Sequence, residues 1–268
     1  MKIKCPAKIN LFLNVIGIKG SMHELCLVNQ TIGIYDEIEL IITNDNAIKI
    51  ESIDDIPLDE TNSIYKAAKL FKETYNISDG FLFKVKKNIP IAAGLGGEST
   101  DAAGTLILLN NYYKLNKSKE ELAKLGIKIG SDIPFFIYSG YKEVLSIGDI
   151  IKEPRIKNPF NWYIIIKPDY GLCTKEMYKK IDSYPFKKID INKMPHNDFM
   201  KVVPNSIIDI KNYINSLNIS NHTLSGSGSA YYIALDKRNI RLYKQMKDNF
   251  KNYNVKIVKN CNGFIINN

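Results

Sequence analysis

The sequence predicts an α+β fold divided into two domains. Residues 3–16 alternate in polarity with the two-residue period of a β-strand. A strand, a glycine-rich loop and a helix then follow one another between residues 84 and 113. The polar segment 148–159 contains two prolines and interrupts the run of regular elements. We therefore expect one domain over residues 1–153 and a second over 154–268.

The composition indicates a folded protein without a nucleic-acid partner. Of the 268 residues, 45% are apolar, which is enough to build a core and excludes general disorder. The formal net charge is +9, but it comes from scattered lysines and not from a dense basic block. A solvated basic surface explains this distribution better than a nucleic-acid stripe. A nucleotide substrate would also gain from the positive field.

The cysteines and the hydropathy pattern favour a cytoplasmic protein that does not contact a membrane. The four cysteines are far apart, so they show neither metal-ligand spacing nor a disulfide framework, and reduced thiols are expected. Lys8 and Asn10 interrupt any apolar signal-peptide core near the N-terminus. No apolar run reaches the length of about 18 residues that a membrane span requires.

Residues 89–103 read IPIAAGLGGESTDAA and predict a phosphate-binding loop. Gly94, Gly96 and Gly97 permit positive φ angles and let a ligand approach the backbone closely. A helix that follows such a loop adds free N–H donors and the positive end of its dipole. The alternative is a plain strand–helix turn in which the glycines serve only packing.

A helix should follow the loop, with its N-cap among Ser99, Thr100 and Asp101 and its buried body over residues 102–113. The loop is neither of the two common phosphate loops. No lysine follows Gly97, as a Walker A loop requires, and Ser99 stands where the dinucleotide fingerprint has its third glycine.

The first strand should place Lys8 and Asn10 side by side on one face, about 6–7 Å apart. Strict alternation assigns Phe12 and Asn14 to that face as well, and the opposite face to Ile9, Leu11, Leu13 and Val15. Taken alone, a lysine and an asparagine on one strand face are usually just exposed to solvent.

Several polar residues have a plain structural interpretation. Asn62 is a candidate N-cap for a helix over residues 64–75, and Ser118 with Glu121 fits a capping box. Asp132, followed by Ile-Pro, fits an ordinary helix start, and His23 fits a surface histidine.

Three motifs together resemble the GHMP kinase superfamily, and within it the 4-diphosphocytidyl-2-C-methyl-D-erythritol kinases. They are PAKINL at residues 6–11, PIAAGLGGESTDAA at 90–103 and LSGSGSA at 224–230, and the segment GSDIP at 130–134 adds to them. The resemblance covers essentially the whole chain. It implies an N-terminal domain like domain 2 of ribosomal protein S5, a ferredoxin-like C-terminal domain, and a site between the two.

The resemblance also implies the roles of individual residues. Asp132 would be the catalytic base, and Lys8 would lie beside it. The ATP-binding residues would be Asn62, Pro90, Ala92, Ala93, Gly94, Leu95, Gly96, Gly97, Ser99 and Thr100. The substrate-binding residues would be Asn10, Met22, His23, Thr174, Tyr178, Gly226, Ser227 and Gly228. Tyr178 would stack on the cytosine, and no side chain is assigned as a metal ligand.

The implied reaction is transfer of the ATP γ-phosphoryl group, with Mg²⁺, to the 2-hydroxyl of 4-diphosphocytidyl-2-C-methyl-D-erythritol in the non-mevalonate route to isoprenoid precursors. We expect a monomer or a homodimer. Two other functions stay open. One is a GHMP kinase for a sugar or an amino alcohol, and the other is a non-catalytic relative that binds a nucleotide or RNA.

Three residues depart from the family pattern. Ser21 and Met22 stand where the family has Gly and Tyr, and Glu98 stands inside the phosphate loop where relatives have Gly or Ser. A Met22 thioether can still pack on a base. The Glu98 carboxylate either points outward or helps to hold Mg²⁺, because repulsion from a phosphate about 5 Å away would cost roughly 3 kcal/mol.

Overall fold

The computed structural model describes residues 1–267 and confirms the α+β class. Its strands are β1 (Lys2–Lys19), β2 (Met22–Thr43), β3 (Ile48–Glu51), β4 (Gly80–Lys86), β5 (Tyr141–Ser146), β6 (Ile150–Lys152), β7 (Trp162–Lys167), β8 (His196–Asn197), β9 (His222–Leu224), β10 (Tyr231–Leu235), β11 (Asn254–Lys259) and β12 (Ile265–Asn267). Its α-helices are α1 (Ser63–Tyr75), α2 (Gly97–Tyr112), α3 (Lys119–Gly126), α4 (Ile133–Tyr138), α5 (Thr174–Ile181), α6 (Asn205–Ser216) and α7 (Ile240–Asn249).

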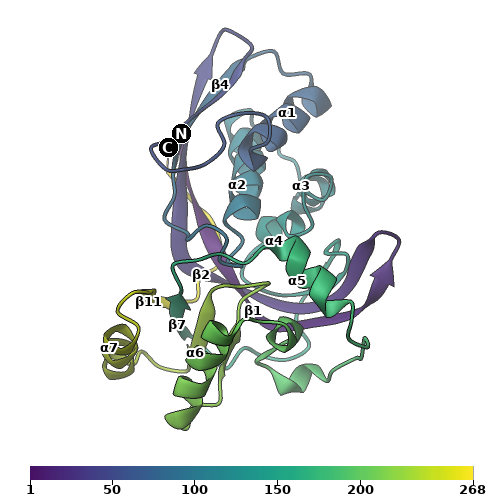
Figure 1. The fold of residues 1–268 in the computed structure, drawn as a ribbon. Coiled ribbons are helices and arrows are strands. Elements are labelled where there is room, and N and C mark those ends of the chain that lie inside the picture. Colours follow the sequence, from purple (N-terminus) through teal and green to yellow (C-terminus); the bar gives the residue numbers. More distant parts are fainter. Residues whose placement is uncertain (268) are drawn as a thin grey trace.

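Two very long strands, β1 and β2, lie at the centre of the first sheet. They pair as an antiparallel hairpin, and β4 and then β3 extend the sheet beyond β2. Helices α1 to α4 lie together on one side of these strands (Figure 1). The face of the sheet toward the helices is apolar, with Phe81, Phe83 and Leu106 fully buried between the two layers. The catalytic candidates on β1 are therefore held on a rigid element.

Irregularities in the β1–β2 pairing change which side chains share a face. The register shifts between Asn10 and Phe12, as a β-bulge does. Leu13 therefore shares the cleft lined by Lys8 and Asn10, while Phe12 packs in a separate core cluster with Ile9. The expectation from strict alternation was right for Lys8 and Asn10. It was wrong for Phe12, Leu13, Asn14 and Val15, because one extra residue reverses the facing of everything after it.

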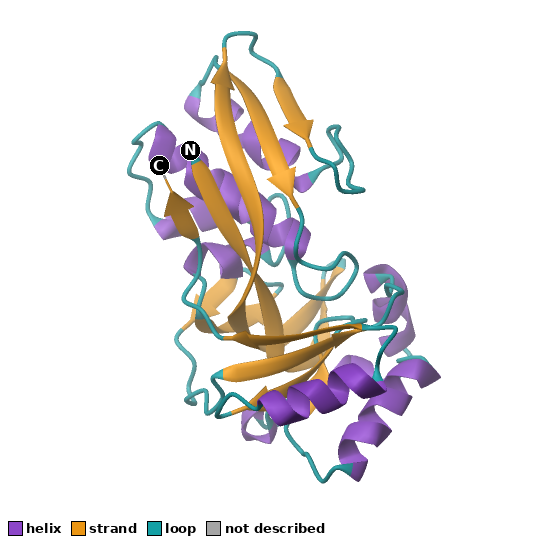
Figure 2. Ribbon diagram, turned by 90° about the vertical axis from the view of Figure 1, so that its left-hand side faces the viewer, coloured by secondary structure: helices purple, strands orange, loops and turns teal. Residues whose placement is uncertain are grey.

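The second sheet has the strand order β11-β7-β10-β9, with every neighbouring pair antiparallel. Along the chain the unit runs β7, α6, β9, β10, α7 and β11. This is the β-α-β-β-α-β arrangement of a ferredoxin-like domain, as expected. Figure 2 shows helices packed on the outer face of this lower sheet.

Two short segments from the second half of the chain return to the first sheet. β8 pairs in parallel with β1 at Phe12 and Leu13, and β12 pairs antiparallel with the start of β1. The N- and C-terminal ends consequently lie side by side (Figure 1). The boundary that we expect near residue 153 stays a prediction, and these two pairings tie the flanking parts together.

The helix starts near the cleft are built in different ways. Asn62 caps α1, with its Oδ1 accepting from the Ile64 N–H at 2.8 Å, and Ser118 and Glu121 form the expected capping box of α3. The N-cap of α2 is Gly96, with φ of 75° and no side chain to cap the helix. Ser99, Thr100 and Asp101 therefore lie inside the helix, after its first two residues, and the prediction that one of them is the N-cap was wrong.

Candidate active site

A cleft of about 550 Å³ collects most of the residues that the sequence motifs single out. It is bounded by β1, by the starts of α1, α2, α4 and α5, and by the loop after β9. The predicted residues that line it are Lys8, Asn10, Asn62, Pro90, Ala92, Ala93, Gly94, Leu95, Gly96, Gly97, Ser99, Asp132, Thr174, Tyr178, Gly226 and Ser227. Residues far apart in the sequence therefore meet around one space.

The glycines of the phosphate loop are required by their surroundings. Gly94 and Gly96 have φ angles of 72° and 75°, in the left-handed region. A Cβ on Gly94 would lie 2.1 Å from the Ser225 carbonyl oxygen, and one on Gly96 would lie 2.6 Å from the Phe136 ring. The packing alternative thus holds at these two positions, but it does not exclude the phosphate role.

The carbonyls of this loop are tied down, which leaves the N–H groups for a ligand. The Leu95 carbonyl accepts from the Lys8 N–H at 2.9 Å, and the Ala93 carbonyl accepts from the Ala230 N–H at 3.0 Å. The Gly94 carbonyl accepts from the Ser225 hydroxyl at 2.9 Å. The first N–H groups of α2 have no partner within the helix, and Gly96 offers no capping side chain. The start of α2 therefore presents unpaired N–H donors, which suit an anion.

A buried ion cluster clamps the two ends of the loop together. Lys87 precedes the loop, and its Nζ donates to Asp36 and to Asp101, the latter at 2.5 Å. Asp36 also accepts from the N–H groups of Asn88 and Ile89, while Asp101 is the fifth residue of α2. Burial, together with the neighbouring Asp36, raises the pKa of Asp101 to about 7 against the pull of Lys87. Sequence reasoning missed this clamp, although Lys87 lines the cleft.

Lys8 and Asp132 form the charged centre of the cleft. The Lys8 Nζ lies 3.8 Å from Asp132 Oδ2 and donates a hydrogen bond of 2.6 Å to Asn10 Oδ1. Only 4% of the Lys8 surface is exposed, and this burial lowers its pKa, with Asp132 opposing the shift. The Asp132 side chain is about one third exposed at the cleft.

Asp132 is the N-cap residue of α4, but its side chain makes no capping hydrogen bond. The cap interpretation is thus correct for its position and wrong for its side chain. The carboxylate is free to accept a proton from a group in the cleft.

The far end of the cleft is apolar and aromatic. Its lining includes Leu13, Leu25 and Leu27 from the long hairpin, together with Tyr178 and Phe199. The rings of Tyr178 and Phe199 meet edge to face with centroids 4.9 Å apart. Leu13 was missed because a bulge that cannot be read from the sequence turns it toward the cleft.

Four predicted binding residues lie off the cleft lining. Met22 is 41% exposed at the tip of the β1–β2 hairpin. His23 stacks on Tyr178 with centroids 4.3 Å apart and lies 2.7 Å from Asp182 Oδ1. Thr100 is fully buried, and its hydroxyl has no partner within residues 1–267. Gly228 instead donates its N–H to the Ser225 carbonyl, which shapes the second loop.

The second glycine-rich loop, residues 225–229, is fixed from two sides. Asn197 donates from Nδ2 to the carbonyls of Leu224 and Gly226 at 2.8 and 2.9 Å. Thr174 Oγ1 lies 2.8 Å from Ser227 Oγ, which connects the loop to the start of α5. Asn197 therefore has a structural role, because it holds these two carbonyls at the start of the loop.

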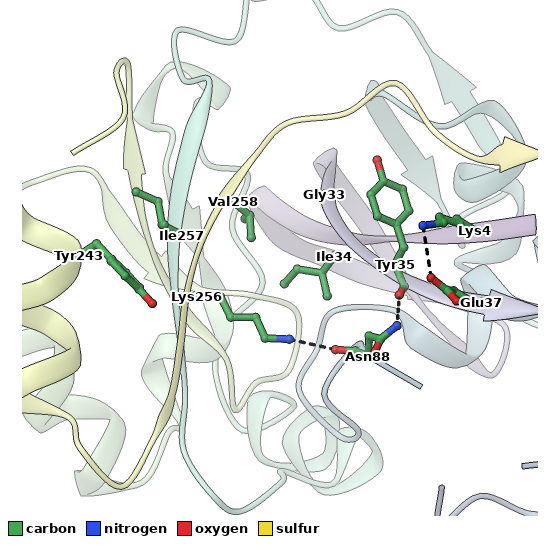
Figure 3. A pocket seen from close by; sticks show the side chains of 10 residues that line it. All are labelled: Lys4, Gly33, Ile34, Tyr35, Glu37, Asn88, Tyr243, Lys256, Ile257 and Val258. Carbon is green, nitrogen blue, oxygen red and sulfur yellow. Dashed lines mark hydrogen bonds and ion pairs between the residues drawn. The ribbon is translucent and has the colours of Figure 1, made fainter. Parts of the chain in front are cut away.

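A second hollow, of about 420 Å³, lies where β2 meets β11, and none of the predicted site residues lines it. Figure 3 shows three polar contacts among its lining residues. Lys256 donates to the Asn88 carbonyl, Asn88 donates to the Tyr35 carbonyl, and Lys4 pairs with Glu37. It offers no free charged group that is comparable to the Lys8–Asp132 pair.

No helix within residues 1–267 has the length and apolarity to cross a bilayer. No group of three or more His, Cys, Asp or Glu side chains within the same residues converges as a metal site.

Known proteins resemble this chain in both sequence and fold. Residues 62–140 match the family described as GHMP kinases N terminal domain. A 4-diphosphocytidyl-2-C-methyl-D-erythritol kinase of Clostridium beijerinckii is 37% identical over 276 residues, covering 94% of this chain and 97% of that protein. The kinase of the same name from Clostridium tetani is 48% identical over 186 residues, which are 68% of this chain and 65% of the relative.

Solved structures agree with the sequence relatives. A 4-(cytidine 5'-diphospho)-2C-methyl-D-erythritol kinase superposes with a TM-score of 0.79 at 22% identity, covering 97% of this chain and 99% of its own. Homoserine kinase from Cytophaga hutchinsonii gives a TM-score of 0.74 at 16% identity, covering 99% and 96%. At these identities the structures show the shared fold, while the Clostridium beijerinckii relative shows the family. The chain belongs to the GHMP kinases, in the 4-diphosphocytidyl-2-C-methyl-D-erythritol kinase family.

Proposed function

We propose that this protein transfers the γ-phosphoryl group of ATP to the 2-hydroxyl of 4-diphosphocytidyl-2-C-methyl-D-erythritol. The observation that carries the proposal is the Lys8–Asp132 pair, which faces the same cleft as the glycine loop and the free start of α2. The names of the sequence relatives support the choice of substrate.

ATP is proposed to place its phosphates on the loop over residues 93–99, against the first N–H groups of α2. Mg²⁺ would come with the phosphates, because this ion keeps phosphate and water ligands and needs only one or two carboxylates from the protein. Glu98 lines the cleft and is the loop residue whose oxygens fit such an ion. When bound, Mg²⁺ would neutralise charge on the polyphosphate.

The chemical step is assigned to Asp132 and Lys8. Asp132 would accept the proton of the substrate hydroxyl as that oxygen attacks the γ-phosphorus. Lys8 would counter the negative charge that collects on the transferred group and on the base. Burial strengthens the effect of the Lys8 charge, because less water screens it.

The cytidine end of the substrate is assigned to the aromatic part of the cleft. Tyr178 and Phe199 offer apolar surface, and Thr174 and Ser227 offer hydroxyl groups next to it. The His23 ring already covers one face of Tyr178. Binding of the cytosine on that face would require the two rings to separate, and binding on another part of the lining would not.

The four cysteines are free, which supports a reducing, cytoplasmic location. We keep monomer or homodimer as the expected assembly.

The test is acceptor-dependent release of ADP by the purified protein with ATP, Mg²⁺ and the erythritol substrate. Turnover that requires the acceptor and is lost in Asp132→Asn is the expected result. Turnover with homoserine or a sugar, and not with this acceptor, would transfer the assignment to another GHMP kinase activity.

A further inference from the structure

The proposed catalytic lysine and two buried asparagines form a row of hydrogen-bonded side chains. Lys8 Nζ donates to Asn10 Oδ1 at 2.6 Å, and Asn10 Nδ2 donates to Asn29 Oδ1 at 2.7 Å. Lys8, Asn10 and Asn29 are 4%, 1% and 0% exposed. Asn10 on β1 and Asn29 on β2 are direct cross-strand partners, so the backbone register fixes their separation.

The hydrogen bonds in this row can point in only one direction. A lysine ammonium donates and never accepts, so the Asn10 amide must turn its oxygen toward Lys8. Its nitrogen then faces Asn29, which must present its own oxygen. An Asn29 amide turned the other way would set two NH₂ groups against each other.

This orientation leaves one buried hydrogen-bond donor unpaired. Asn29 Nδ2 is buried and has no hydrogen-bond acceptor within residues 1–267. A buried donor without a partner is destabilising. A leucine at position 29 would remove this donor, but it would leave Asn10 Nδ2 without the acceptor that Asn29 Oδ1 provides. The contact with Asn10 is therefore what explains an amide at position 29.

Resting on the function proposed above, we propose that Asn29 is a positioning residue, which holds the Asn10 amide so that its oxygen keeps the Lys8 ammonium in place beside Asp132. The Asp132 carboxylate is 3.8 Å from Lys8, beyond hydrogen-bond distance, so Asn10 supplies the direct anchor. Without Asn29 the Asn10 amide is free to rotate.

Few groups act on the Lys8 charge. Asp132, at the start of α4, is the charged group that opposes the effect of burial on Lys8. The other neighbours of Lys8 carry no charge: Asn10 on β1, Thr31 across on β2, and Gly96 of the phosphate loop. A change at Asn29 should therefore reach Lys8 through Asn10 and be visible in the Lys8 titration.

Two substitutions test the proposal in opposite directions. Asn29→Asp keeps the oxygen that accepts from Asn10 and adds a buried negative charge near the ammonium, so the pKa of Lys8 should rise. Asn29→Leu removes the acceptor, frees Asn10 and should lower that pKa. Thr31→Val is the matched control. Thr31 is fully buried on β2 and is the cross-strand neighbour of Lys8, but its hydroxyl donates to the Cys261 carbonyl and accepts from the Gly140 N–H, outside the Lys8–Asn10–Asn29 row.

The Lys8 titration is read directly from the ¹³Cε resonance of labelled lysine, assigned with Lys8→Arg. This measurement needs no turnover, so it separates the proposed role of Asn29 from the proposed reaction. If Lys8→Ala retains activity, the catalytic assignment fails, and the titration still decides whether Asn29 acts on Lys8.

The kinetic readout is kcat and KM for ATP as a function of pH. Asn29→Leu should lower kcat about tenfold or more, leave KM for ATP within about twofold, and move the alkaline loss of activity to lower pH. Asn29→Asp should move that loss to higher pH, and Thr31→Val should do neither. Folded Asn29 variants whose Lys8 titration and alkaline limb match the parent would overturn the proposal, whatever their stability.

Discussion

Lys8 is a buried ammonium with one charged neighbour, and this makes its contribution to catalysis separable. The side chain is anchored by Asn10 and faces Asp132 at 3.8 Å. We expect Lys8→Ala and Asp132→Asn each to reduce the chemical step at least about 10²-fold, because each removes a positioned charge or proton acceptor. Single-turnover kinetics measures this step. Lys69→Ala, at an exposed lysine of α1, is the control and should be neutral.

An experiment can distinguish two roles for Glu98: holding Mg²⁺ and repelling the phosphates. Its backbone carbonyl accepts from the Ser63 hydroxyl at 2.8 Å, and the residue lines the cleft. Since a carboxylate attracts Mg²⁺ and repels phosphate, Glu98→Gly should weaken binding of Mg²⁺-ATP by a few-fold or more. Calorimetric titration with and without Mg²⁺ checks this. Tighter binding by the variant would show instead that Glu98 opposes the phosphates.

At the scale of one element, the phosphate loop depends on the Asp36–Lys87–Asp101 clamp. The pKa of Asp101 is raised from 3.8 to about 7, so between these values the folded protein holds a proton that the unfolded chain releases. The contribution of Asp101 to the free energy of unfolding should therefore decrease as the pH rises from about 4 to about 7. Asp101→Asn removes the titrating group and should flatten this part of the profile.

The measurement is urea unfolding across that pH range, with the difference between parent and variant plotted against pH. Asp209→Asn, at an exposed acid on α6, should leave the profile parallel to that of the parent. A parent profile that rises over the same interval, with no difference in Asp101→Asn, would contradict the raised pKa.

At the scale of the molecule, the two glycine-rich loops meet in direct backbone contact. Gly94 lies against Ser225, so Gly94→Ala should force the loops apart and reduce kcat/KM for both ATP and the acceptor at least about tenfold. Gly140→Ala is a matched control, because Gly140 has a similar φ of 75° with nothing within 4 Å of the added carbon. Steady-state kinetics distinguishes the two. Equal losses in both variants would mean that backbone strain, and not loop contact, limits activity.

The sequence by itself determined the family, the α+β class and most of the residues that line the cleft. Local signals sufficed for this: the glycine loop, the capping box at Ser118 and the strand face shared by Lys8 and Asn10 depend on residues that are near in the chain. The three motifs then placed Asp132 and the loop around residue 226 in the same site, because their combination is specific to one superfamily.

Only the tertiary structure decided how the site is held. The bulge after Asn10 brings Leu13 to the cleft, Lys87 joins Asp36 to Asp101, and Asn29 reaches Lys8 through Asn10. These contacts link strands and helices that are distant in sequence. The position of Leu13 also depends on a one-residue shift in pairing that leaves no mark in composition or period. The sequence motifs therefore identify the site. The pairing of strands that are distant in the sequence decides which polar and charged side chains surround it.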